Sequence, residues 1–214
     1  FSQQIHQLLG WEKVITESMA MYQAGRATFR KSAKPKVEAQ LWILEGIAGG
    51  LQPWWHHVGA LQEDQRQFEI AEPIYQWHQA NEQYLINREP VASVGLLWSQ
   101  RNADFFGRDH AHELLELPWR GWTRALTHAR VPYLPVHVDD LDSEGSRFAA
   151  LILPNIGALS DAHVASVRHL VQGGCTLIAT GRTGLYDESG VPRADFAFAD
   201  LLGAHYVPLG HESD

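Results

Sequence analysis

The sequence has a single cysteine, Cys175, which excludes an internal disulfide and any zinc site built from several thiolates. No apolar run approaches the roughly 18 residues that a membrane-spanning helix needs. The first residues also lack the basic and apolar regions of a secretion signal. These absences predict a chain without a membrane partner, and the lone thiol favours a cytoplasmic location.

Positive charge is scarce as well, because 17 Lys and Arg stand against 25 Asp and Glu, for a net charge of −8. The basic residues form no stripe, so the chain offers a phosphate backbone no general attraction. We therefore expect no nucleic-acid partner. Apolar residues are plentiful, at 45% of the chain with eight Trp, which is typical of a packed globular protein. A length of 214 residues accommodates two modest domains.

From Pro90 onward, short apolar runs alternate with stretches of helical spacing. The runs at 91–98, 133–138, 149–153 and 175–180 predict four strands. Helices are predicted between them, one marked by Trp119, Trp122 and Leu126 and another capped by Ser160. A last helix is predicted over 194–202. This alternation implies right-handed crossovers, and hence an α/β fold with a flavodoxin-like, doubly wound parallel sheet over 90–214.

In such a sheet, ligands and catalytic groups collect beyond the carboxyl ends of the strands, which directs attention to the turn after Thr180. Class I glutamine amidotransferases share this architecture and place a catalytic cysteine at that turn. Here the turn reads GRTG, and Cys175 opens the strand at its opposite end. Arg182 stays protonated, and Thr183 would need a base that the neighbouring sequence does not supply. We expect this domain to perform no catalysis.

The order and spacing of these segments resemble a known family. The run ALILPNIGALSD, a helix, VQGGCTLIATGRTGLYDESG and then ADFAFADLLG are similar to the trimerisation domain of glycoside hydrolase family 42 β-galactosidases. The resemblance covers Val91 to about Ala204. In that family the domain has the class I glutamine amidotransferase-like fold without its nucleophile. The resemblance implies a non-catalytic domain that joins subunits in a homo-oligomer, which in this family is a trimer.

Residues 1–89 should then resemble the end of the catalytic barrel that precedes this domain in the family. The stretch 35–50 predicts a helix, 51–56 (LQPWWH) a strand, and 72–87 a second helix with Pro73 in its first turn. The apolar stripe of the first helix comprises Val37, Leu41, Leu44 and Ala48. The segments LWILEGIAGG and PWWHH occupy the places of the family's last helix motif and aromatic final strand. The resemblance implies the carboxyl-terminal part of a glycosidase-like (β/α)8 barrel.

One element earlier, the segment VITES places Glu17 at the end of a short apolar stretch. This is the position of the family's seventh barrel strand, which carries the nucleophilic glutamate. A retaining glycosidase needs two carboxyl groups about 5–5.5 Å apart. The resemblance implies Glu17 as the nucleophile, with Glu12 as its rival and an exposed, non-catalytic glutamate as the alternative. The general acid/base, on the family's fourth strand, is expected upstream of Phe1.

Sugar-binding residues are expected near the last strand, because the active site of such barrels lies at the carboxyl ends of the strands. Trp54, Trp55 and His56 would face this site. Neighbouring strand residues point in opposite directions, so one tryptophan could stack on a sugar ring while the other packs under the helices. Beyond the strand, Glu63 and Arg66 in the segment QEDQR could bind sugar hydroxyls, although a charged loop is more often only solvated.

Two histidine pairs resemble metal ligands only superficially. His56 and His57 alternate across a strand, and His110 and His112 would diverge by about 200° on a helix. Neither pair predicts a metal site, and no other motif predicts a cofactor.

Three functions from different classes remain open. The first is the carboxyl-terminal piece of a retaining, β-galactosidase-like hydrolase that acts on a carbohydrate and is inactive without its general acid/base. The second is a non-catalytic interaction or oligomerisation module. The third is an amidotransferase-like hydrolase, which the missing cysteine disfavours. The segments PWWHH and QEDQR depart from the phenylalanine, tryptophan and arginine run expected of β-galactosidases, so the sugar is left open.

Overall fold

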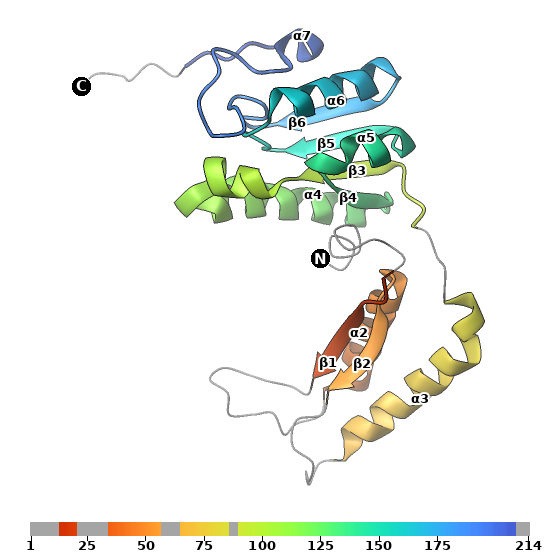
Figure 1. The fold of residues 1–214 in the computed structure, drawn as a ribbon. Coiled ribbons are helices and arrows are strands. Elements are labelled where there is room, and N and C mark those ends of the chain that lie inside the picture. The colour runs from red at the N-terminus through yellow and green to blue at the C-terminus, as the bar shows by residue number, and fades with distance from the viewer. Residues whose placement is uncertain (1–12, 21–33, 57–64, 86–89, 209–214) are drawn as a thin grey trace. The chain divides into compact units, whose positions relative to one another are not determined.

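The computed structural model describes residues 13–20, 34–56, 65–85 and 90–208. The chain divides into two compact units, Phe1–Pro90 and Val91–Asp214. They are called unit 1 and unit 2 below, and each is described by itself (Figure 1).

Unit 2 is built on a parallel sheet of four strands. Its strands are β3 (Val94–Trp98), β4 (Tyr133–His137), β5 (Ala150–Pro154) and β6 (Thr176–Thr180). They are ordered β4-β3-β5-β6, and every pair is parallel. The central residues of β3, β4 and β5 are buried because helices cover both faces of the sheet. This strand order is the flavodoxin-like one, and the predicted fold class is confirmed.

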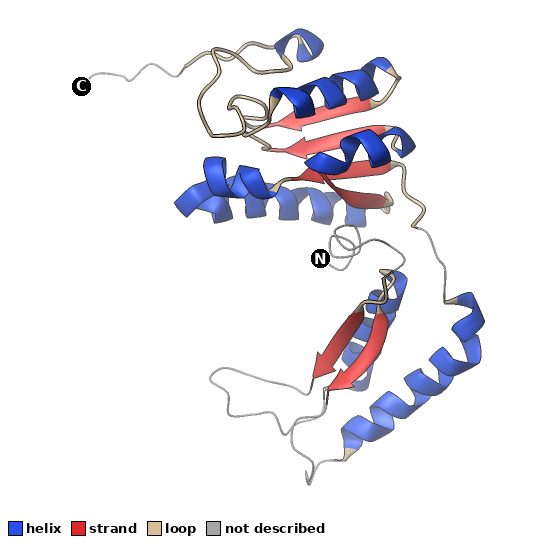
Figure 2. Ribbon diagram, viewed as in Figure 1, coloured by secondary structure: helices blue, strands red, loops and turns tan. Residues whose placement is uncertain are grey.

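Helices lie on both faces of this sheet (Figure 2). On one face, α4 (Leu117–His128) packs Trp119 and Trp122 against a cluster that contains Leu96. The other face carries α5 (Leu141–Glu144) and α6 (Asp161–Gln172). As predicted, the Ser160 hydroxyl caps α6 by accepting a hydrogen bond from the backbone N–H of His163 at 3.2 Å.

The last predicted helix is mostly absent. Of the predicted range 194–202, only α7 (Ala199–Leu202) is helical, and it ends as expected at Gly203, whose φ of 63° suits glycine. The Asp195 carboxylate accepts hydrogen bonds from the backbone N–H groups of Phe196 and Tyr206, both at 2.8 Å. These hydrogen bonds occupy backbone N–H groups that a helix would otherwise use, and they hold this part of the chain in a non-helical conformation.

Unit 1 follows the order strand, helix, strand, helix. Strand β1 (Thr16–Ala20) is followed by α2 (Lys36–Ala48), β2 (Gln52–His56) and α3 (Arg66–Asn81). The two strands pair in parallel. Ile43, Ile47 and Ile74 form the buried cluster between the helices, and Trp55 and Leu85 pack against it.

The predicted apolar stripe of α2 is wrong. Val37, Leu41 and Leu44 are 65%, 55% and 42% exposed. The buried residues are instead Ala39, Ile43, Gly46 and Ile47. A helix that is apolar on more than one side gives the hydrophobic pattern no way to choose the buried face. Contact with Trp55 and Ile74, which are distant in sequence, decides it.

The predicted start of α3 is also wrong. The helix begins at Arg66, six residues before the predicted start at 72, and Pro73 lies inside it. A proline inside a helix removes one backbone hydrogen bond. Burial of Ile70, Ala71 and Ile74 on one side of the helix offsets that loss.

Candidate functional site

The carboxyl edge of the unit 2 sheet is where a flavodoxin-like fold binds its ligand, at the point where the strand order reverses between β3 and β5. Here protein side chains fill that point. Asn102 is fully buried, and its amide donates to the Asn155 carbonyl at 3.2 Å. Its amide oxygen accepts from the Ala158 N–H at 2.9 Å. Hydrogen bonds therefore join the segment after β3 to the segment after β5.

Asn155 extends this closure toward β6. It adopts a left-handed backbone conformation with φ of 56°. Its side chain donates to the Leu114 carbonyl and accepts from the Arg182 N–H, both at 2.7 Å. Any side chain at Gly181 would collide with it, so glycine is needed there.

The turn after β6 offers no nucleophile. Thr183 is 3% exposed, and its hydroxyl donates to the Thr180 carbonyl at 2.7 Å. The same oxygen accepts from the Ile156 N–H at 3.2 Å. The hydroxyl is thus committed to the backbone, and Arg182 beside it stays a cation. An attacking group has no place at this turn.

Cys175 lies at the opposite edge, one residue before β6 begins. Burial raises the pKa of its thiol, against the smaller opposing effect of a hydrogen bond with the Leu151 backbone. A thiol with a raised pKa is mostly protonated at neutral pH and is a poor nucleophile.

In unit 1, three of the residues predicted to bind sugar end the second strand. Trp54, Trp55 and His56 are the last three residues of β2. Trp54 is 53% exposed, whereas Trp55 packs against the isoleucine cluster under the helices. The two rings therefore face opposite ways, as the strand geometry predicts. The side chain of His56 lies outside the part of the chain that the structure describes.

Glu17 occupies a different place in its strand from the one predicted. The apolar pair at 14–15 precedes β1, which begins at Thr16, so Glu17 is the second strand residue and not the last. Its backbone is in register with Pro53. The Glu17 side chain, and all of Glu12, His57 and Glu63, lie outside the described part of the chain.

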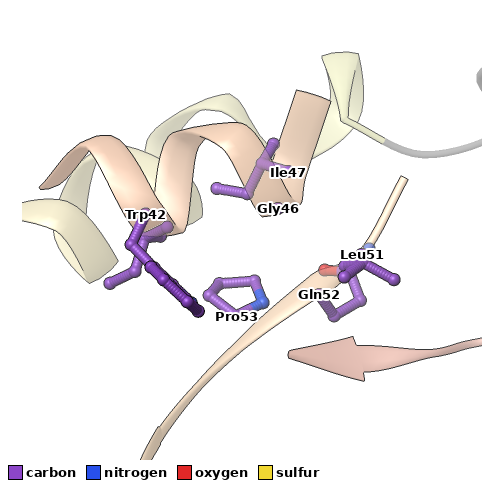
Figure 3. Close-up of a pocket in the computed structure, with 7 residues that line it drawn as sticks. Trp42, Gly46, Ile47, Leu51, Gln52 and Pro53 are labelled. Carbon is purple, nitrogen blue, oxygen red and sulfur yellow. The ribbon is translucent and has the colours of Figure 1, made fainter. Parts of the chain in front are cut away.

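Hollows border the helices of unit 1, among them two that residues of α2 help to line. One lies between α2 and β2, where Trp42, Gly46 and Ile47 approach Pro53 (Figure 3). It has no room for a water molecule and is an apolar packing defect.

The other hollow is open, with a volume of about 450 Å³, and we call it the basic hollow. It is lined by Lys34, Pro35, Lys36, Arg66, Glu69 and Ile70. Arg66 thus begins a helix at the edge of a hollow, although the sequence predicted it in a loop.

Several other titratable groups pair with one another. His112 contacts Glu116 at 3.1 Å, and His163 contacts Asp139 at 2.8 Å. Over the described ranges, no group of three His, Cys, Asp or Glu side chains is arranged to hold a metal ion. Nor does any helix in those ranges have the length and hydropathy to cross a membrane.

Comparisons with solved structures identify the fold. A β-galactosidase from Bacillus circulans sp. alkalophilus superposes with a TM-score of 0.76 over 93% of this chain and 32% of its own, at 14% identity. The catalytic mutant of a GH42 β-galactosidase from G. stearothermophilus gives 0.61 over 76% and 26%, at 16% identity. The fold is that of part of a GH42 β-galactosidase. The resemblance seen in the sequence is confirmed at the level of fold.

An α-L-fucosidase isoenzyme from Paenibacillus thiaminolyticus has a similar portion, with a TM-score of 0.57 over 83% of this chain and 26% of its own, at 21% identity. This chain therefore spans about a third or less of the length of each of these three proteins. No protein-family model and no curated protein sequence matches it.

Proposed function

We propose that this chain is the carboxyl-terminal portion of a retaining glycoside hydrolase of the β-galactosidase type, which acts in carbohydrate metabolism. The observation that supports this most directly is the parallel β1–β2 pair, with exposed Trp54 near the carboxyl end of β2, in a fold shared with GH42 β-galactosidases. An exposed indole face at such an edge suits stacking on a sugar ring.

In this proposal unit 1 supplies part of the sugar site. Glu17 attacks the anomeric carbon, and Trp54, His56, Glu63 and Arg66 contact the substrate. Of the residues predicted from the sequence to bind sugar, Trp55 packs under the helices instead and supports the strand. The general acid/base comes from a segment upstream of Phe1, so the chain alone is inactive. No cofactor takes part, because a pair of carboxyl groups performs this reaction without one.

Unit 2 has a different role in the proposal. Its carboxyl edge is filled by Asn102, Asn155 and Thr183, which supports a non-catalytic unit. By the family resemblance, its role is to join subunits in a homo-oligomer, a trimer. The mass of the chain in solution tests this assignment, and a strict monomer contradicts it. Cytoplasmic location remains a prediction from the sequence.

The nucleophile assignment is tested in the parent protein with an aryl glycoside. Replacement Glu17→Gln removes the attacking oxygen, and we expect kcat to fall by roughly 10³-fold or more. The control is Glu45→Gln, an exposed glutamate on α2, which should leave kcat unchanged. A 2-deoxy-2-fluoro glycoside should add the mass of one sugar to the peptide that contains Glu17. Label on another peptide, or full activity of Glu17→Gln, rejects the assignment.

A further inference from the structure

Helices α4 and α5 lie on opposite faces of the unit 2 sheet (Figure 1). The strand order β4-β3-β5-β6 explains this arrangement, because the chain crosses from β3 outward to β4 and then returns past β3 to β5. Crossovers between parallel strands are right-handed, so two that run in opposite directions leave their helices on opposite faces. The charges of these two helices are therefore presented on two different surfaces.

The surface of α4 is positively charged. From 117 to 138 the chain has three arginines and no Asp or Glu. Arg120 and Arg124 are both exposed, and they lie one turn apart on the same side of the helix. Glu116, one turn earlier, contacts Arg120 at 3.4 Å and offsets only part of this charge.

Exposed apolar surface surrounds these arginines. Trp119 and Trp122 are only partly buried against the sheet, and Leu117 is 51% exposed. At Gly121 a methyl group would meet no other part of the protein within 4 Å, so another surface has room to approach. Trp and Arg are enriched at the centres of protein interfaces. The arginine face, as it is called below, comprises Leu117, Trp119, Arg120, Trp122 and Arg124.

The segment 139–144, which leads into α5 and forms it, carries the opposite charge and is called the acidic segment. Its carboxylic acids are Asp139, Asp140, Asp142 and Glu144. Arg147 contacts Glu144 at 2.9 Å, and His163 contacts Asp139 at 2.8 Å. These two contacts offset part of the charge, and the acidic segment as a whole stays negative.

The carboxylates of the acidic segment also repel one another. Burial raises the pKa of Asp140 most, His137 opposes this rise, and the charges of Asp139 and Glu144 add to it. Asp142 is exposed on α5. A cation brought to this surface from outside relieves the repulsion, so the acidic segment favours a positively charged partner.

The two surfaces are complementary to each other and not to themselves. Each chain has a net charge of −8, so two copies repel one another at long range. Contact through the same surface would add to this repulsion, whereas the arginine face of one copy and the acidic segment of another bring opposite charges together. A contact between two different surfaces closes into a ring when the rotation between copies permits. The trimer implied by the resemblance is a ring of this kind.

We propose that the arginine face binds the acidic segment of a second copy of this chain, with Arg120 and Arg124 of one copy paired to carboxylates that include Asp142 of the next. The planar guanidinium suits this role because it binds a carboxylate through two parallel hydrogen bonds. This interface rests on the proposed assembly role of unit 2 and makes it specific. It does not depend on the hydrolysis of a glycoside.

The mass of the 214-residue chain in solution, measured by sedimentation, tests the proposal. We expect an oligomer whose association weakens as salt is added, because salt screens exposed charges. The double variant Arg120→Glu, Arg124→Glu should weaken association at least about tenfold, since repulsion replaces attraction at both positions. The matched control is Arg101→Glu, Arg182→Glu, which makes the same change of charge at two exposed arginines outside α4 and should leave association unchanged.

A charge swap distinguishes lost pairing from a damaged fold. The double variant Asp142→Arg, Glu144→Arg should also weaken association. A chain with both pairs of substitutions should associate again, because the charges have been exchanged between the two surfaces. Failure of this chain to associate overturns the proposal, as does unchanged association of Arg120→Glu, Arg124→Glu.

The same measurements separate this interface from the proposed function. An oligomer that none of the substitutions affects retains the assembly role of unit 2 and rejects the arginine face. A strict monomer rejects both. Neither result bears on hydrolysis, which the Glu17→Gln experiment tests independently.

Discussion

Replacement of Asn102 by alanine tests whether the closed edge of unit 2 is structural. Its side-chain oxygen accepts a hydrogen bond from the backbone N–H of Ala158, a residue that is 2% exposed. The Asn102 side chain also donates to the Asn155 carbonyl, which keeps a second donor in the Gly157 N–H at 2.9 Å. An unpaired buried group costs about 1–3 kcal/mol, and only the Ala158 N–H is left without a partner. With the small cavity added, we expect a loss of about 2–3 kcal/mol.

The assay is thermal unfolding of the whole chain, with hydrogen exchange to locate the effect. At roughly 4 °C per kcal/mol for a unit of this size, Asn102→Ala should lower the Tm of unit 2 by about 8–12 °C. The Ala158 amide should show the largest gain in exchange rate. The matched control is Gln100→Ala, an exposed amide bonded to Asp104 at 3.0 Å, which should change stability by less than about 0.5 kcal/mol. Equal effects of the two substitutions would refute the reasoning.

Two further predictions concern unit 2. Arg168 makes a bidentate pair with Asp200 at 2.8 and 2.5 Å, which lowers the pKa of Asp200 from 3.8 to about 2. The pair therefore stabilises the fold above pH 3.8, and this stabilisation is lost as the pH falls toward 2. In an NMR titration, Arg168→Gln should return the pKa of Asp200 toward 3.8. An unchanged pKa contradicts the pairing. Gly157→Ala should destabilise by about 1–3 kcal/mol in urea unfolding, because its methyl group would lie 2.7 Å from the Phe106 ring. By contrast, Gly121 lies inside α4, and a methyl group added there would meet no other part of the protein within 4 Å. Gly121→Ala should therefore stabilise the fold by about 0.5–1 kcal/mol. If Gly121→Ala proved less stable than Gly157→Ala, the packing described here would be contradicted.

The sequence alone determined the architecture of unit 2. Its strands are short apolar runs because a parallel sheet covered on both faces needs apolar residues on each side, and these runs stand out in any sequence. The cap at Ser160 and the glycine stop at Gly203 are local features with local causes, and both are confirmed. The split between Trp54 and Trp55 followed from strand alternation alone.

Only the tertiary structure decided which apolar face of α2 is buried. Ile43 and Ile47 pack with Ile74 and Trp55, whereas Leu41 on the other face is exposed. The tertiary structure also decided that 194–198 is not helical, through the hydrogen bond that the Tyr206 N–H donates to the Asp195 carboxylate. It brought Lys36 and Arg66, thirty positions apart in the sequence, to one hollow. Each outcome depends on contacts between residues distant in sequence, and periodicity and local propensity carry no information about such contacts.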